Sequence, residues 1–295
     1  MASRQIWELV RHLPKRTVGS NKSHGGRLWV IAGSGRFPGA AVLASTAAAR
    51  VGAGYVGLSP LGGTQQTTTL WLKAPDFIAL PATVKTLSEF QPRAVAIGPG
   101  IGKAPAAQAK AKKILKTLKA HSEIAVVVDA DGLSALGRAP LPSHWILTPH
   151  SGELARLLKW SVKKVDEDRA RAIREAQRRF GCIVVLKGHG TLIAAPAVGR
   201  RPAGACLLFK NTSGNAALAK AGTGDVLTGI IAGLLAQKVS PLEAARLGVW
   251  LHGWLADRWF ESGRDHLSLM ATDLLASLPE ALAEVRATYR RSGSR

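Results

Sequence analysis

Short apolar runs, many of them β-branched, alternate with longer segments of mixed polarity over the first two thirds of the chain. Several of these runs are apolar without interruption, which is typical of strands buried on both faces of a parallel sheet. The pattern therefore predicts strands at residues 28–32, 94–97, 124–128, 145–147, 183–186 and 192–194.

Apolar residues recur at helical spacing between these strands and through most of the last third of the chain. Pro241 suits the first position of a helix, with Ser240 as its cap. Strands alternating with helices predict an α/β fold with a doubly wound, mostly parallel sheet. We find no repeat or linker, and expect one domain over residues 1–295 with an N-terminal extension at 1–24. The predicted helices are 40–50, 106–120, 152–158, 166–180, 224–237, 241–260 and 272–288.

The composition is that of an ordinary globular protein, with 46% hydrophobic and 20% charged residues, so disorder, collagen and coiled coil are excluded. Cys182 and Cys206 are the two cysteines, too few for a disulfide framework or a four-cysteine zinc site. No run reaches the roughly 18 to 20 apolar residues of a membrane span. The N-terminus has no apolar signal segment, so we expect a soluble cytoplasmic protein without a membrane partner.

The net charge of +21 makes polyanions attractive partners. Residues 103–119 hold six lysines and no acid, but Ile114, Leu115 and Leu118 give that segment a helical apolar face, so its lysines are interpreted as a solvated surface. A nucleic-acid protein would show a focused basic face with stacking aromatics. Neither is evident, and we expect no nucleic-acid partner.

Glycine-rich or polar segments follow five of the predicted strands, at 33–35, 98–102, 129–131, 148–153 and 187–191. Ligands of open α/β sheets bind at the carboxyl ends of the strands. The sequence therefore predicts a ligand site along that edge. Residues 33–35 are not a dinucleotide fingerprint, because the third glycine of the GxGxxG pattern falls at Pro38.

Gly222, Thr223, Gly224 and Asp225 open a predicted helix, and bare amides at a helix N-terminus bind anions. Asp225 has two interpretations that the spacing leaves open. It is either a first-turn carboxylate favoured by the helix dipole, or a base that takes a proton from a hydroxyl attacking a phosphoryl group. The segment lacks the GxxxxGK[ST] pattern of a Walker A loop.

The other polar candidates also have structural interpretations. His150 and Glu153 can cap the helix near residue 152, and Asp129 and Asp131 can close a turn after a strand. Lys187 is better founded, because a cation near phosphates has an evident use. His189 is read as an exposed loop imidazole, and His252, on an apolar helix, as a packing residue.

Taken in order, these segments resemble the ADP- or ATP-dependent NAD(P)H-hydrate dehydratases, a branch of the ribokinase-like superfamily. The GTGD turn alone would indicate only the superfamily, whereas Asp-Ala-Asp, Thr-Pro-His-x-x-Glu and the long block ending beyond Asp225 are more specific. The match runs from about residue 14 to 260. It is carried by residues 21–34, 39–40, 50–54, 98–102, 128–131, 147–153, 186–191, 211–229 and 252–253.

The resemblance implies a three-layer α/β/α sandwich and an enzyme that removes water from hydrated NADH or NADPH with ADP or ATP as phosphoryl donor. Asp225 would be the base, and Gly222, Thr223 and Gly224 the anion hole. Mg²⁺ would accompany the nucleotide, with no separate metal site on the protein. The implied nucleotide-binding residues are Lys187, Gly188, His189, Gly190, Thr191, Asn215 and Gly224. The implied substrate-binding residues are Ala40, Gly100, Gly102, Asp129, His150, Glu153 and Asp225.

Three positions depart from the family pattern. Lys220-Ala221 stands where a second glycine is usual, Phe37-Pro38 where a tyrosine-like residue is expected, and Ser134 where an asparagine is common. The alternative function is a kinase of the same superfamily that phosphorylates a hydroxymethyl group of a vitamin precursor. The resemblance also implies a homo-oligomer, a tetramer in relatives. Because few residues precede the first strand, any NAD(P)H-hydrate epimerase is expected to be a separate chain.

Overall fold

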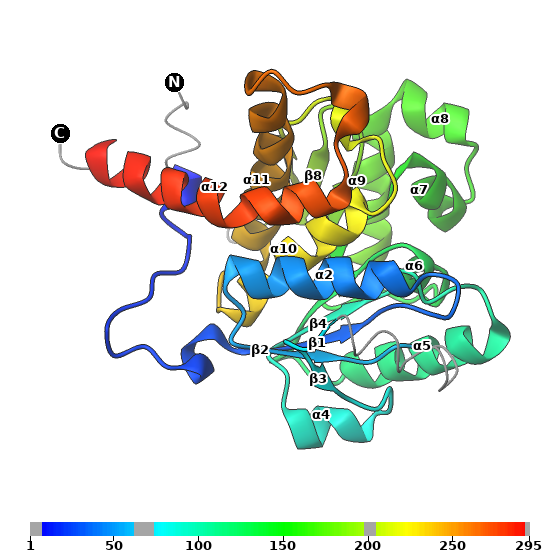
Figure 1. Ribbon diagram of the computed structural model, residues 1–295. Coiled ribbons are helices and arrows are strands. Elements are labelled where there is room, and N and C mark those ends of the chain that lie inside the picture. The colour runs from blue at the N-terminus through cyan, green and yellow to red at the C-terminus, as the bar shows by residue number, and fades with distance from the viewer. Residues whose placement is uncertain (1–7, 62–73, 198–204, 293–295) are drawn as a thin grey trace.

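A computed structural model describes residues 8–61, 74–197 and 205–292, and these ranges contain one nine-stranded sheet flanked by helices (Figure 1). The strand order is β3-β2-β1-β4-β5-β6-β7-β8-β9. Strands β1 to β7 pair in parallel, and β8 and β9 add an antiparallel edge. The strands are β1 (Arg27–Ile31), β2 (Tyr55–Leu58), β3 (Ile78–Ala79), β4 (Ala94–Ile97), β5 (Ala125–Val128), β6 (Ile146–Leu147), β7 (Ile183–Leu186), β8 (Leu192–Pro196) and β9 (Cys206–Lys210).

The helices form a layer on each face of the sheet, so the predicted α/β/α sandwich with a mostly parallel sheet is confirmed. One layer contains α2 (Pro38–Val51), α10 (Thr223–Ala236), α11 (Pro241–Glu261) and α12 (Ala271–Ser292). The other contains α4 (Lys85–Phe90), α5 (Pro105–Leu118), α6 (Asp131–Ser134), α7 (Ser151–Leu158), α8 (Val162–Glu167) and α9 (Arg169–Phe180). Three short 3₁₀ helices are η1 (Lys22–Gly25), η2 (Ala216–Leu218) and η3 (His266–Ser268).

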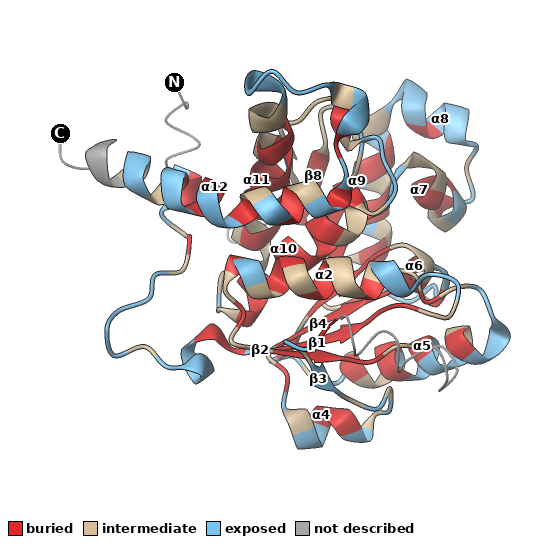
Figure 2. Ribbon diagram, viewed as in Figure 1, coloured by how far each residue is buried: buried red, intermediate tan, exposed pale blue. Residues whose placement is uncertain are grey.

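Alternate residues of the central strands serve the two layers. In β1, Leu28 and Val30 belong to the core under α2 and α10, whereas Trp29 and Ile31 belong to the core under α5. All four side chains are fully buried, and β1 and β4 lie in the buried interior of the molecule (Figure 2). Period-two alternation explains why these runs are apolar throughout: neither face of the strand meets water.

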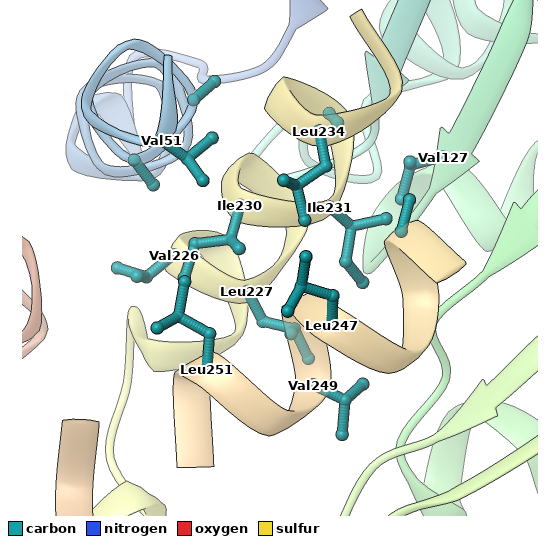
Figure 3. Close-up of a cluster of buried hydrophobic side chains, with 14 of the residues drawn as sticks. Val51, Val127, Val226, Leu227, Ile230, Ile231, Leu234, Leu247, Val249 and Leu251 are labelled. Atoms are coloured by element: carbon teal, nitrogen blue, oxygen red, sulfur yellow. The ribbon is translucent and has the colours of Figure 1, made fainter. Parts of the chain in front are cut away.

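Helix α10 is the most buried helix of its layer, with twelve of its fourteen residues buried. Figure 3 shows its side chains Ile230, Ile231 and Leu234 between α2, α11 and the sheet. Two glycines permit its close approach to α2: a Cβ on Gly229 would lie 2.1 Å from the Ala44 carbonyl oxygen, and one on Gly233 would lie 2.4 Å from a methyl of Val51. The position of the N-terminus of α10 is therefore fixed by packing along its whole length.

Several sequence-based boundaries differ from the structure. Strands β2, β3 and β9 were not predicted: β2 is four residues interrupted by Gly57, β3 is two exposed residues, and β9 is a partly buried edge strand whose ladder partner is β8. The predicted helix 166–180 is divided, because Asp168 caps a new helix and accepts a hydrogen bond from the Arg171 amide. Ser240 stands at the N-cap of α11, but its side chain makes no capping hydrogen bond.

The chain reverses its direction across the sheet between β1 and β4, and ligands bind at such switch points. The loops after these two strands are joined by a 2.7 Å hydrogen bond from the Gly33 amide to the Pro99 carbonyl oxygen. None of the helices in the described ranges combines the length and the apolar character of a membrane span. The expected extension at 1–24 is described from residue 8 onward.

Candidate active site

Asp129, Lys187 and Glu153 follow three neighbouring strands and meet at the carboxyl edge of the sheet. The Lys187 Nζ lies 2.5 Å from Asp129 Oδ1 and 3.8 Å from Glu153 Oε2. The second carboxylate oxygen of Asp129 accepts a 2.8 Å hydrogen bond from the Thr228 hydroxyl, on α10. Asp129 is 1% exposed, so its charge is held entirely by partners within the protein.

The charge of Lys187 is maintained by these carboxylates. Burial by itself lowers the pKa of an ammonium group, but the charges of Asp129, Glu153 and Asp225 outweigh burial, and the pKa of Lys187 is raised. Lys187 is therefore a fixed cation. A methyl group placed on Gly224 would lie 3.6 Å from its Nζ, so this cation stands directly beside the first turn of α10.

The first turn of α10 presents free backbone donors. Gly222 precedes the helix in the left-handed region, with φ 88°, which a glycine adopts without strain. In the described part of the chain, the amides of Gly224 and Asp225 have no acceptor. The Thr223 hydroxyl is turned back to the carbonyl oxygens of Leu218 and Lys220. The helix thus opens with two donors, a positive dipole end and a nearby ammonium group, which together suit a phosphoryl group.

Asp225 lies in this first turn with a perturbed carboxyl group. Its pKa is raised from 3.8 to about 7, mainly by burial and also by the charge of Asp129, while the charge of Lys187 opposes the shift. A carboxyl group that titrates near neutrality is poised to act as a base. Of the two interpretations of Asp225, a perturbed first-turn carboxyl beside an anion cradle favours the base.

A cavity of about 500 Å³ opens beside the anion cradle, of the size that small-molecule sites occupy. It is lined by every residue that the resemblance assigned to the nucleotide, namely Lys187, Gly188, His189, Gly190, Thr191, Asn215 and Gly224. Residues 188–191 are the turn between the antiparallel strands β7 and β8, and residues 211–215 follow β9. The edge hairpin therefore forms one wall of the cavity.

Two half-buried polar residues that the sequence pattern did not single out, Asp257 and Arg169, hold these walls. Asp257, on α11, accepts hydrogen bonds from the Gly214 amide at 2.8 Å and from the Asn215 side chain at 3.1 Å. The Arg169 guanidinium donates to the carbonyl oxygens of Leu186 and Lys187. The only sequence signal is a polar residue within an apolar or strand-end context, which does not reveal the distant partner.

His252 lines the same cavity, and burial lowers its pKa to about 4. Its neutral ring donates through Nε2 to the Thr223 carbonyl oxygen at 2.9 Å. His252 therefore braces the start of α10 and does not titrate near neutrality. His189, in contrast, is exposed at the rim.

Three of the residues assigned to the hydrated cofactor, Ala40, Gly100 and Gly102, lie at or near the first turn of α2 or in the loop after β4. Ala40 is in the first turn of α2, and a Cβ on Gly100 would lie 2.7 Å from the Ala40 Cβ. The Gly102 amide donates to Asp131 Oδ2 at 3.1 Å. One turn further along α2, Leu43 comes within 2.7 Å of a Cβ placed on Gly222, so this wall adjoins the anion cradle.

His150 and Glu153 form a reciprocal capping box at the start of α7. The His150 Nδ1 accepts from the amides of Gly152 and Glu153, and Glu153 Oε2 accepts from the His150 amide at 2.8 Å. The interpretation of both residues as helix-capping residues is therefore confirmed. The same arrangement turns the Glu153 carboxylate toward Lys187 and leaves the His150 ring half exposed.

The three departures from the family pattern lie at the edges of the site. Lys220 donates to the Leu267 carbonyl oxygen, away from the cradle, and Ala221 is exposed. Phe37 is 45% exposed and contacts the Gly100 loop. Ser134 is exposed at the end of α6. In the described ranges, no group of three His, Cys, Asp or Glu side chains surrounds a metal position.

The family model for NAD(P)H-hydrate dehydratase matches residues 28–280, which includes all these segments. The chain belongs to the NAD(P)H-hydrate dehydratase family. It is 39% identical over 268 residues to the ADP-dependent (S)-NAD(P)H-hydrate dehydratase of Neisseria meningitidis, covering 88% of this chain and 86% of that protein.

A solved structure of the Bacillus subtilis ADP/ATP-dependent NAD(P)H-hydrate dehydratase, crystallised with ATP and Mg²⁺, superposes with a TM-score of 0.79 at 32% identity. The alignment covers 94% of this chain and 96% of that one. The bifunctional NAD(P)H-hydrate repair enzyme of Coxiella burnetii is 37% identical over 272 residues, 90% of this chain. The match spans only 52% of that relative, so the chain covers about half the length of the bifunctional family members.

Proposed function

We propose that this protein dehydrates hydrated NADH or NADPH to the reduced cofactor, with ADP or ATP as the phosphoryl donor. One observation carries the proposal: a carboxyl group with a pKa near 7, Asp225, lies in the same helical turn as two free amides. A base and an anion cradle are what phosphoryl transfer to a hydroxyl group needs. The family relationship supports hydrated NAD(P)H as the substrate and an adenine nucleotide as the donor.

In the first step, Asp225 takes the proton of the ring hydroxyl as that oxygen attacks the terminal phosphorus of the nucleotide. A base with a pKa near the working pH is present in its ionised form and still accepts a proton readily. The attacking oxygen then approaches from the α2 side, where the Gly100 loop packs directly against Ala40 in the first turn of that helix.

The amides of Gly224 and Asp225 and the ammonium group of Lys187 stabilise the charge that develops on the phosphoryl oxygens. Lys187 is already charged and held, so little reorganisation accompanies transfer. Mg²⁺, when bound, would neutralise negative charge on the nucleotide phosphates, and this ion usually keeps several waters among its ligands.

In the second step, the phosphorylated ring oxygen leaves with its phosphate, and loss of a proton from the adjacent ring carbon restores the double bond. The sum of both steps is loss of water from the cofactor. The oxygen of the ring hydroxyl and the phosphoryl group of the nucleotide leave together as inorganic phosphate. A hydroxymethyl kinase would stop after the first step, because its product has no ring proton to lose.

The test is recovery of the near-ultraviolet absorbance of NADH from NADH hydrate with Mg²⁺, with ADP and ATP in parallel. We expect recovery that needs a nucleotide and is lost in Asp225→Asn. The matched control is Asp76→Asn, which neutralises an exposed aspartate far from the cavity. Absence of recovery with either nucleotide would overturn the dehydratase, and recovery that survives Asp225→Asn would overturn the role of the base.

A further inference from the structure

A second cavity, of about 210 Å³, lies on the other helical layer, behind α7. Its walls are the segment after α6, one side of α7 and the last turn of α9. Leu136, Leu157 and Phe180 form its apolar part. It adjoins the catalytic cluster through one shared residue, Glu153, whose carboxylate faces Lys187.

Four cations line this cavity: Arg138, Arg156, Lys159 and Arg179. In the described ranges none of them forms an ion pair. Glu153 is the single acid of the lining, and its carboxylate is already engaged by the His150 amide and by Lys187. Four positively charged residues therefore line one concavity whose single acid is already paired.

Helix ends account for part of this arrangement. Arg156 and Lys159 end α7, and Arg179 ends α9, where cations are favoured by the helix dipole. Arg138, in contrast, lies in the segment after the short helix α6 and not at the end of α7 or α9. The four cations therefore come from three separate segments of the chain. The lysines of α5, in contrast, are spread along an exposed helix face. A concave site focuses the field of its charges, whereas a spread surface does not.

We propose that this cavity binds a small phosphorylated anion. Arg guanidinium groups present paired N–H donors that match phosphate oxygens, and three of the four cations are arginines. The volume of about 210 Å³ lies below the ~300 Å³ at which pockets for larger ligands begin, which favours a small anion over a nucleotide.

The experiment is isothermal titration of the full chain with inorganic pyrophosphate at saturating ADP, which occupies the anion cradle of α10. We expect one binding event in the wild type. The variant Arg156→Ala/Arg179→Ala removes two of the four cations and should weaken that event at least about tenfold. The control Lys110→Ala/Arg174→Ala removes two charges from exposed positions on α5 and α9 outside the cavity, and binding should stay near the wild-type value.

Three results would overturn the proposal. One is no binding of pyrophosphate by the wild type, and another is equal weakening in the two double variants, which would indicate net charge alone. The third is binding of citrate as tightly as pyrophosphate, which would mean that the cavity reads charge and not phosphate. None of these readouts uses the dehydration reaction, so failure here and failure of the proposed function are distinguishable. Orthophosphate and glycerol phosphate in parallel distinguish a free ion from a phosphate ester.

Discussion

The Thr228 hydroxyl donates a 2.8 Å hydrogen bond to Asp129 across 99 positions of sequence. Asp129 in turn holds Lys187, and Lys187 stands beside Gly224. Thr228 lies one helical turn after Asp225, so the helix that carries the base also anchors the partner of the phosphate-facing cation. Thr228 is therefore a positioning residue that acts through Asp129.

Thr228→Val is expected to lower kcat about tenfold, which corresponds to the loss of one hydrogen bond to a charged group. Valine has the shape of threonine without the hydroxyl, so packing is preserved. Thr228→Ser retains the hydroxyl and should recover most of the activity. Steady-state kinetics of the three proteins, with the pH profile of each, is the measurement. Equal activity of Val and Ser variants would contradict the positioning role.

The pH profile of kcat/KM is expected to rise through an inflection near pH 7 and then level off. Asp225 is active as the ionised base, and burial raises its pKa to about 7. Nucleotide phosphates add negative charge nearby, so the inflection of kcat should lie higher than that of kcat/KM. An inflection near the ordinary aspartate value would show that Asp225 is solvated in the working enzyme.

Asp225 also costs stability, and the sign follows from its raised pKa. Between its ordinary value of 3.8 and about 7 the folded state binds more protons than the unfolded state, so stability falls as the pH rises through that window. Asp225→Asn removes this penalty. We expect it to be more stable than the wild type at pH 8, by up to about 4 kcal/mol, and the gain to vanish near pH 4.

Thermal unfolding at the two pH values measures this difference as a shift in Tm. For chains of 150–250 residues, 1 kcal/mol shifts Tm by roughly 2–4 °C. Asp76→Asn, at an exposed position, is the control and should change little with pH. A gain in stability that is the same at both pH values would mean that ionisation of Asp225 is not its origin.

Gly229→Ala is expected to destabilise the protein by about 2 kcal/mol or more. The added Cβ would lie 2.1 Å from the Ala44 carbonyl oxygen, so α2 and α10 would have to separate. Gly39→Ala, in the first turn of α2 with nothing within 4 Å of the added Cβ, is the control and should be neutral or stabilising by up to ~1 kcal/mol. Urea unfolding of both variants decides whether the close approach of the two helices is required.

Much of the architecture was predictable because it follows from local pattern. Uninterrupted apolar runs such as Val126–Val128 mark strands buried on both faces, and the polar segments that follow them mark the ligand edge. The weakly patterned elements were missed: β3 is exposed, and β9 depends on its antiparallel pairing with β8. Strand pairing of this kind is a tertiary property, because packing and not propensity decides it.

Local pattern along the chain is enough to predict the layered α/β fold, the edge at which ligands bind and the Gly222–Asp225 turn, because periodicity, glycine and helix-start chemistry act over a few residues. Packing in three dimensions, in contrast, is what holds Asp129 between Thr228 and Lys187 and raises the pKa of Asp225 by burial. Charge partners and desolvation depend on which distant segments meet. The spacing of residues along the chain therefore predicts neither the charge partners nor the desolvation.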